Sequence, residues 1–333
     1  MINEEKVQRL VFEILEVLKE KEREGPVGAR VIARALDKRG FKIGERGVRH
    51  HLRILDERGF TKKSGPLEGR TLTEKGKEET RHALVGKRVG FVVGKIEELI
   101  YKMTYNIKTR TGTVIVNISL LDAKEVKKAL PVIKKVIDAE YAPSPFVKIA
   151  GEGERIAGTA VPRGKVGIAM VCSVTIDGLL AKAGIPVSPK FGGLLEIEKG
   201  EPKRFTDVIT YQGSSLDPLD VFASRKMTSY LNVLKQGSGQ ILANLREIPM
   251  SARSHAQEIV SQAKYGGLGG VLIVGAPGEP LYGLPVDVNK VGVIVMGGIN
   301  PIAAVEESGI KADTKTMEAV LDIAEMKPIQ QWM

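Results

Sequence analysis

The stretch GKVGIAMVCSVTIDGLLAKAGIPV at residues 164–187 aligns without a gap to NKVGVIVMGGINPIAAVEESGIKA at residues 289–312. From Lys165 and Lys290 onward, 5 of 23 aligned positions are identical, whereas background residue frequencies predict about one. Each stretch shows an apolar run, a short turn and a second segment of helical character. The chain therefore contains an internal duplication of a strand–turn–helix unit, and this unit decides the fold class.

The similarity extends outward from these two stretches. At separations of 124 to 127 residues, TGTVIVNIS at 111–119 matches SGQILANLR at 238–246, and Tyr141, Gly151 and Gly158 match Tyr265, Gly275 and Gly283. Hydrophobic periodicity predicts a strand, a helix and two further strands in each half, at 113–121, 123–140, 146–150 and 166–171 and again at 240–248, 252–265, 271–274 and 291–296. A short helix follows each set. We expect a mixed α/β effector module with halves at residues 106–205 and 206–333.

The turns that lead into the two short helices are candidate ligand sites. Backbone N–H groups at the start of a helix are unpaired and attract anions. The residues that could contribute are Cys172, Ser173 and Thr175 in the first half, and Gly297, Gly298 and Asn300 in the second. Every strand-to-helix turn has this character, so an ordinary turn remains the alternative.

A polar segment between the halves and one arginine complete the candidate effector site. In 206–225 we expect a short strand, a Gly-Ser-Ser turn and a helix beginning at Asp217-Pro218, so that a cleft could be lined by Tyr211, Gly213, Ser214 and Ser215. Arg246 ends an apolar strand, and a buried guanidinium needs a partner. That partner is either a ligand carboxylate or, inside the protein, Glu247 or Asp217.

Positive charge is concentrated at the N-terminus. The net charge is +10, and residues 1–88 hold 22 Lys and Arg against 15 Asp and Glu, a net +7. Residues 89–333 hold 28 against 25, a net +3. A basic segment favours a polyanion, because Lys and Arg release the counterions condensed on phosphates.

Three helices are predicted in this basic segment, at 4–21, 27–38 and 45–58, with an apolar stripe that includes Val7 on the first helix and Val31 on the second. On the third helix Val48, Leu52 and Leu55 share one face. The opposite face carries Arg46, Arg49, His50 and Arg53. Arginine can pair with guanine in the major groove, so this face suits base recognition. A solvated surface is the alternative.

The sequence after the third helix predicts two short strands around a Gly/Pro turn in 59–73, and then a helix from Thr73. This order resembles the winged-helix repressors of bacteria and archaea. We expect a winged-helix DNA-binding domain at 1–75 and a helical connector at 76–105. Lys62, Lys63 and Arg70 on the wing would contact phosphates and position the domain.

The motifs together resemble the NrpR family of archaeal nitrogen-regulon repressors. The resemblance rests on GTVIVN at 112–117, YQGSSLDP at 211–218, ILANLREIP at 241–249 and GGINP at 297–301, behind a winged helix. It implies a dimer that binds palindromic double-stranded operator DNA, represses nitrogen-assimilation genes and releases DNA when 2-oxoglutarate accumulates. Some members carry two sensor modules. This chain has room for one, so either a homodimer or an assembly with a second family subunit is expected.

Composition limits the other possibilities. One cysteine and four histidines without metal-ligand spacing predict no structural metal and no cofactor beyond the effector. The apolar runs are too short to cross a bilayer and the charged start lacks a signal sequence, so a cytoplasmic protein is expected. An enzyme or metabolite-binding protein with an accessory nucleic-acid-binding winged helix is the alternative, although no catalytic motif is found. An RNA-binding module also remains open, although aromatic residues are only 5%.

Overall fold

The computed structural model describes residues 2–21, 25–64, 69–82 and 90–333. The chain divides into two compact units, Met1–Lys87 and Arg88–Met333. The division lies later than the expected domain boundary at residue 75. The expected boundary between the halves, at residue 205, lies inside a strand.

The N-terminal unit has the predicted order of helices and strands. Its elements are α1 (Ile2–Glu20), α2 (Ala29–Lys38), α3 (Glu45–Glu57), β1 (Thr61–Ser64), β2 (Gly69–Leu72) and α4 (Glu74–His82). Strands β1 and β2 pair in antiparallel fashion. The predicted Gly/Pro turn at 65–68 lies outside the described residues. This arrangement is a winged helix.

The core of this unit is built from the predicted apolar stripes, including Ile14, Ile32 and Leu52. Two predictions for this core are wrong. Val7 is 44% exposed, and Val31 is 43% exposed because it projects to the side of the face that buries Ile32.

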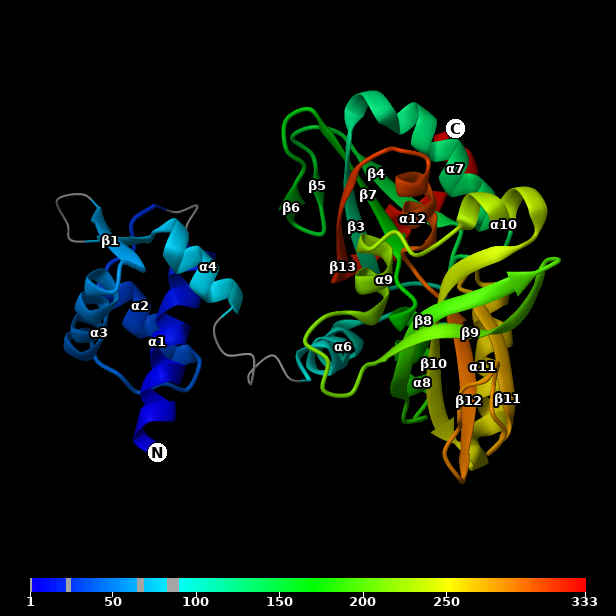
Figure 1. The fold of residues 1–333 in the computed structure, drawn as a ribbon, viewed down its shortest axis with the longest axis horizontal. Coiled ribbons are helices and arrows are strands. Elements are labelled where there is room, and N and C mark those ends of the chain that lie inside the picture. Colours follow the sequence, from blue (N-terminus) through cyan, green and yellow to red (C-terminus); the bar gives the residue numbers. More distant parts are fainter. Residues whose placement is uncertain (1, 22–24, 65–68, 83–89) are drawn as a thin grey trace. The chain divides into compact units, whose positions relative to one another are not determined.

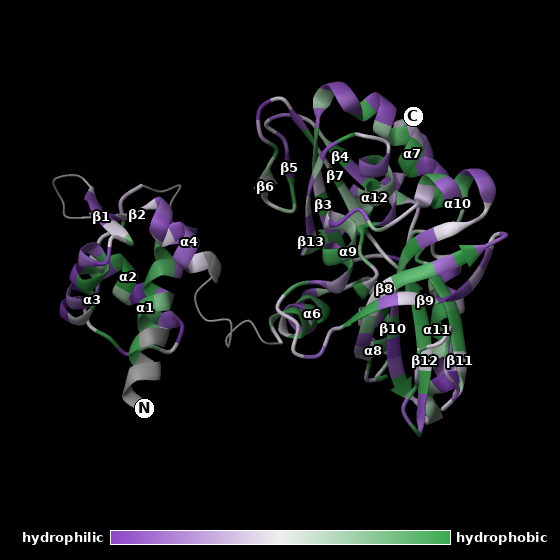
Figure 2. Cartoon of the chain, viewed as in Figure 1, coloured by the Kyte–Doolittle hydropathy of each residue, from purple (hydrophilic) through white to green (hydrophobic). Residues whose placement is uncertain are grey.

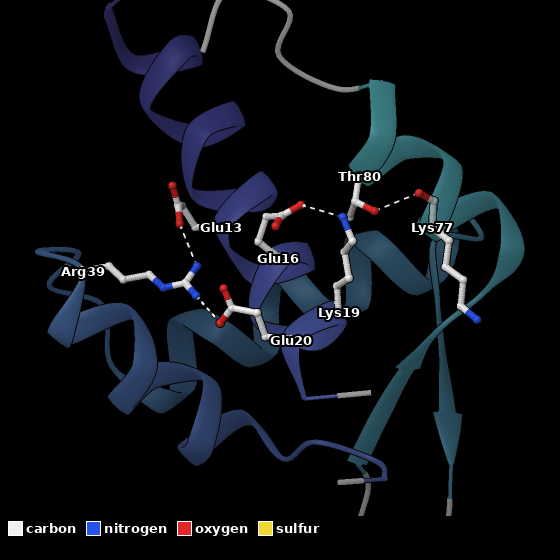
Figure 3. A network of polar contacts seen from close by, with 7 residues as sticks. All are labelled: Glu13, Glu16, Lys19, Glu20, Arg39, Lys77 and Thr80. Atoms are coloured by element: carbon white, nitrogen blue, oxygen red, sulfur yellow. Dashed lines mark hydrogen bonds and ion pairs between the residues drawn. The ribbon is translucent and has the colours of Figure 1, made fainter. Parts of the chain in front are cut away.

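Arg39 ties the first two helices together (Figure 3). It follows α2 and donates hydrogen bonds to Glu13 at 3.0 Å and to Glu20 at 2.5 Å, both on α1. Thr73 supports the start of α4, because its hydroxyl oxygen accepts a hydrogen bond from the Gly76 N–H at 3.0 Å. These contacts fix the positions of α1, α2 and α4, the helices against which α3 and the wing pack.

The C-terminal unit begins with α6 (Phe91–Lys102) and contains two copies of a β-α-β-β-α-β repeat. The first comprises β3 (Thr113–Asp122), α7 (Val126–Asp138), β4 (Phe146–Ala150), β7 (Lys165–Val171), α8 (Val174–Lys182) and β8 (Ser188–Glu198). The second comprises β10 (Gly239–Pro249), α11 (Arg253–Tyr265), β11 (Val271–Pro277), β12 (Lys290–Met296), α12 (Asn300–Glu307) and β13 (Ala312–Asp322). Between them lie β9 (Glu201–Thr210), α9 (Pro218–Ser224) and α10 (Tyr230–Gln236). The duplication is confirmed.

The repeats exchange their last strands (Figure 1). Within residues 90–333 the two five-stranded sheets have the orders β13-β3-β7-β4-β14 and β11-β12-β10-β8-β9, with β14 at Lys327–Pro328. All neighbouring strands are antiparallel. Strand β8 of the first repeat pairs with β10 of the second, and β13 of the second pairs with β3 of the first. Neither β8 nor β13 was predicted.

The helices mix in the same way. Helix α12 packs on α7, and α8 packs on α11, so each helix layer contains one helix from each repeat. Two hydrophobic cores result, and both draw residues from the two sheets. Figure 2 shows the apolar strands of this unit. The halves therefore form one interlocked unit. Among the described residues, no helix combines the length and apolar character needed to cross a bilayer.

Candidate functional sites

The outer face of α3 is a basic surface. Val48, Leu52 and Leu55 are buried beneath it, and the side chains of Arg46, Arg49, His50 and Arg53 are exposed. Two of these arginines pair along the helix: Arg49 with Glu45 at 2.5 Å, and Arg53 with Glu57 at 4.0 Å. Exposed pairs of this kind contribute little stability and are easily exchanged for a stronger anion. The predicted stripe is thus arranged as a helix face that can enter a groove.

This face belongs to a wider concave surface between α3, the start of α2 and the wing. The surface is lined by Arg30, Arg46, Arg49, Arg53, Lys63 and Arg70, against Glu45 and Asp56. Arg30 was not anticipated. Its side chain is 74% exposed and its Nε lies 3.4 Å from a Glu45 carboxylate oxygen. Arg30 lies in the first turn of the helix that precedes α3, and a basic residue at that place was the sequence signal that could have identified it.

The wing residues do not all lie where the sequence suggested. Lys62 and Lys63 are exposed. Arg70 is only 8% exposed, and its guanidinium Nε donates to Asp56 Oδ2 at 2.8 Å. Asp56 also accepts a hydrogen bond from Thr61 at 2.6 Å. Arg70 therefore joins β2 to the end of α3 rather than extending along the wing beside Lys62 and Lys63.

In the C-terminal unit, the two candidate turns touch each other. A Cβ at Gly298 would lie 2.8 Å from the Cα of Cys172 and 2.9 Å from the backbone nitrogen of Ser173. Only glycine permits so close an approach without displacing backbone. The turns that start α8 and α12 therefore meet where the two repeats join.

A small cavity lies at this junction. It is lined by Asn117, Cys172, Ser173, Val174, Tyr211, Asp217, Leu219, Gly298, Ile299, Thr316 and Met317. Its volume is about 10 Å³, which suits about one water molecule. Four predicted effector residues, Cys172, Ser173, Tyr211 and Gly298, are thus brought together. A larger ligand requires the walls to move apart.

A chain of buried polar side chains runs from this cavity. Tyr211 donates to Asn244 Oδ1 at 2.5 Å, and Asn244 Nδ2 lies 3.4 Å from Ser173 Oγ. In the other repeat, Asn117 Oδ1 accepts a hydrogen bond from the Met317 N–H at 2.9 Å. Asn117 and Asn244 occupy equivalent positions in β3 and β10. Sequence reasoning missed both, although a polar residue at the same place in two aligned apolar strands was a usable signal.

Arg246 lies at the end of this chain, fully buried. It forms an ion pair with Asp177 of α8, which is 1% exposed, and its NH2 group lies 3.5 Å from Ser173 Oγ. The internal ion pair considered from the sequence does exist, but with Asp177 rather than with Glu247 or Asp217. Arg246 Nη1 and Asp177 Oδ2 make no hydrogen bond within the described residues.

Burial changes the acidity of the groups around the cavity. It raises the pKa of Cys172 to about 12, so the thiol is protonated and unreactive as a nucleophile. It also raises the pKa of Asp177, against the opposing pull of Arg246, and the pKa of Asp217. A protonated carboxyl can donate a hydrogen bond to an anion, whereas a carboxylate repels it.

An acidic groove of about 420 Å³ adjoins the cavity, and Asp217 and Ile299 line both. The groove runs between α9, α12 and β13, and its acidic lining residues are Asp217, Asp220, Glu306 and Asp313. Burial and the neighbouring Asp217 raise the pKa of Asp220 to about 7. Neither Asp220 nor Thr316, which donates to it at 2.6 Å, was identified from the sequence.

Several predicted effector residues have other contacts. The Thr175 hydroxyl donates to the Ile115 carbonyl at 3.1 Å and accepts from the Ile115 N–H at 3.2 Å, which attaches α8 to β3. Asn300 is buried and donates to the carbonyls of Tyr141 and Leu242. Four others also lie outside the cavity lining: Gly213, Ser214, Ser215 and Gly297.

Two family models match the chain. The model for NrpR regulatory domains NRD1 and 2 covers residues 89–328, and the model for the Ribonuclease R winged-helix domain covers residues 12–80. The first match corresponds to the interlocked duplicated unit. The second corresponds to the basic N-terminal unit.

Relatives align along almost the whole chain. The chain is 47% identical over 323 residues to the global nitrogen regulator NrpRI of Methanosarcina mazei, covering 97% of this chain and 98% of the relative. It is 33% identical to the global nitrogen regulator NrpR of Methanococcus maripaludis and 32% identical to that of Methanocaldococcus jannaschii, covering 95% and 98% of this chain but only 54% and 56% of those proteins. A crystal structure of a nitrogen repressor-like protein from Methanococcus jannaschii is similar with a TM-score of 0.62 and 30% identity, covering 72% of this chain and 98% of that one.

Proposed function

Because the chain belongs to the NrpR family, we propose that it is a DNA-binding transcriptional repressor of nitrogen-assimilation genes that releases DNA when 2-oxoglutarate binds. The observation that carries this proposal is the pairing of a basic recognition surface in one unit with a polar cavity between exchanged repeats in the other. The first suits a phosphate polymer. The second can change shape when it is filled.

The DNA-binding part of the proposal rests on α3. Its exposed arginines extend from a helix whose opposite face is buried, which is the arrangement that presents guanidinium groups to base edges in the major groove. Arg30 and Lys63 flank this face and suit phosphate contacts. One recognition helix covers only a half-site. A dimer on a palindromic operator, or an assembly with a second family subunit, is therefore part of the proposal.

The effector part rests on the junction of the repeats. Ser173 at the helix start, Asn117 and the protonatable carboxyl of Asp217 line the cavity there. Behind Ser173 lie the Asn244 amide and Arg246, whose Nη1 makes no hydrogen bond within the described residues. Hydrogen-bond donors in low dielectric can hold a dicarboxylate, provided that the nearby acids are protonated. The small volume of the cavity implies that binding of a dicarboxylate moves at least one of its walls. That movement supplies the two states that effector control requires.

A second candidate is RNA binding, which the match of the N-terminal unit to a ribonuclease winged-helix model favours. The proposed and alternative functions predict different ligands for the basic surface. Fluorescence anisotropy of the full chain with labelled operator duplex, scrambled duplex and single-stranded RNA distinguishes them. Tightest binding to the operator duplex, weakened by 2-oxoglutarate but not by succinate, supports the proposal. Preference for RNA, or a duplex affinity that 2-oxoglutarate leaves unchanged, contradicts it.

A further inference from the structure

The second repeat's exchanged strand carries a distortion beside the cavity. Along β13, Lys315 pairs with Ile118 and Ala319 pairs with Val116, so Thr316, Met317 and Glu318 stand opposite the single residue Asn117. Met317 has a φ of 48°, a left-handed conformation that strains a residue with a side chain. Residues 316–318 are called the β13 bulge below.

Three side chains from three different elements hold this bulge. Asn117 of β3 accepts from the Met317 N–H at 2.9 Å, and Asp220 of α9 accepts from the Thr316 hydroxyl at 2.6 Å. Lys95 of α6 donates through Nζ to the Thr316 carbonyl oxygen at 3.0 Å. A strained segment of this kind persists only while its surroundings determine its conformation.

The bulge is also a wall of the cavity, which Thr316 and Met317 both line. Asn117 lies in the middle of a ladder, and the two turns at Cys172 and Gly298 are in backbone contact with each other. The bulge residues lack ladder partners. When a ligand larger than one water enters, the bulge is therefore the wall that moves at least cost.

Helix α6 links this wall to the rest of the chain. It packs against α8 and β13, and it is the described helix of this unit nearest in sequence to the DNA-binding unit. Next to its C-terminal end, Met103 is fully buried and sits so close to Gly178 of α8 that a Cβ there would lie 2.7 Å from the Met103 sulfur. The C-terminal end is thus anchored in the core. The N-terminal half also packs in the core, through Val92 and Ile96, and Lys95 ties its polar side to the bulge.

We propose that Lys95 is the coupling residue of this protein: filling the inter-repeat cavity displaces the β13 bulge, breaks the Lys95–Thr316 hydrogen bond and lets α6 shift on the core, and α6 is the described helix of this unit nearest in sequence to the DNA-binding unit. The inference rests on the proposed function, because it assigns the route between its two sites. Lys95 itself does not line the cavity. It acts through the Thr316 carbonyl and contacts neither ligand.

The test uses the full chain and the variants Lys95→Met, Lys95→Arg and Lys102→Met. Lys102 is the matched control, an exposed lysine on the same helix that pairs with Glu98. For each protein, anisotropy measures the operator Kd with and without saturating 2-oxoglutarate, and calorimetry measures the 2-oxoglutarate Kd without DNA. The ratio of the two operator Kd values is the coupling factor, which by linkage theory is typically about 5–150-fold.

Wild type and Lys102→Met are expected to show the same coupling factor of about tenfold or more. Lys95→Met lacks the hydrogen bond with or without ligand, so we expect its ligand-free operator Kd to rise at least about fivefold toward that of ligand-saturated wild type, its coupling factor to fall below about twofold and its 2-oxoglutarate Kd to be no weaker than that of wild type. Lys95→Arg, which keeps a donor, is expected to restore part of the coupling. The inference is overturned if Lys95→Met keeps the wild-type coupling factor, or if it loses 2-oxoglutarate binding. A wild-type protein that binds operator but ignores 2-oxoglutarate overturns the proposed function instead, and the inference with it.

Discussion

Gly298 and Cys172 come from equivalent turns of the two repeats, and a Cβ at Gly298 would lie only 2.8 Å from the Cys172 Cα. Gly298→Ala must push these turns apart, and overpacking of this kind costs about 1–3 kcal/mol. We expect a lower urea midpoint for this variant. Gly94→Ala is the control, because nothing lies within 4 Å of a Cβ at that position of α6. An unchanged midpoint for Gly298→Ala would show that the turns separate freely.

The arginines of α3 should determine operator specificity. Replacing Arg49 or Arg53 by Ala should weaken operator binding by about 1–3 kcal/mol each and relax base preference, because a bidentate base contact is lost. Lys62→Ala should weaken operator and scrambled duplexes about equally, because a phosphate contact carries no sequence information. Competition anisotropy with both duplexes measures the difference. Wild-type discrimination by both arginine variants would refute the assignment of α3 as the reading helix.

Arg70 should behave differently from the other wing residues. Its partly buried pair with Asp56 joins β2 to α3, so Arg70→Ala should lower the melting temperature of the protein. As the temperature rises, operator binding by this variant should decrease in step with its folded fraction. Thermal melts and anisotropy at several temperatures test this relation. Weak operator binding by a fully folded Arg70→Ala protein would instead indicate direct DNA contact.

Removing one partner of the Arg246–Asp177 pair should lower the free energy of unfolding strongly, whereas replacing both partners by apolar residues should lower it only slightly. Arg246→Met leaves the Asp177 carboxyl buried without a partner, and such losses reach about 3–5 kcal/mol. Removing both charges in Arg246→Met/Asp177→Leu should recover most of that loss. Urea unfolding of the two single variants and the double variant gives the coupling energy. Additive losses would mean that the pair contributes no interaction of its own.

Stability should depend on pH through Asp220. Burial raises its folded pKa from 3.8 to about 7, so between these values the folded protein keeps a proton that the unfolded chain releases. Stability should therefore fall as pH rises from about 4 to about 7, by up to about 1.4 kcal/mol per pH unit for one proton, and level off above. Asp220→Asn should flatten this slope, whereas Asp313→Asn, an exposed carboxyl of the same groove, should not. Equal slopes for wild type and Asp220→Asn would contradict the assignment.

Effector binding should take up protons. A dicarboxylate near Asp217 and Asp220 raises their pKa values further, so 2-oxoglutarate affinity should fall between pH 6 and pH 8, by up to about tenfold per pH unit for one proton. Calorimetry in phosphate and in Tris, which differ in ionisation enthalpy, measures the number of protons. Identical heats in the two buffers would show binding without proton uptake.

The sequence by itself determined the local structure and the duplication. Periodic apolar residues specify the helices of the winged helix and the strands β3 and β10, because burial of one face depends only on spacing along the chain. The equivalence of the turns at Cys172 and Gly298 followed from direct alignment. The basic face of α3 followed from helical geometry once Val48, Leu52 and Leu55 were placed inside.

Only the tertiary structure decided which repeat receives each last strand. Strands β8 and β13 were missed because each pairs with a strand of the opposite repeat, β10 or β3, so its burial depends on a partner distant in sequence as well as on its own alternation. The same holds for the charged residues. The sequence predicted Arg70 as an exposed wing residue, whereas in the fold it pairs with Asp56. Arg246 pairs with Asp177, which lies 69 residues earlier in the chain. A buried charge pairs with whatever group the packing brings close, and spacing along the chain does not reveal that group.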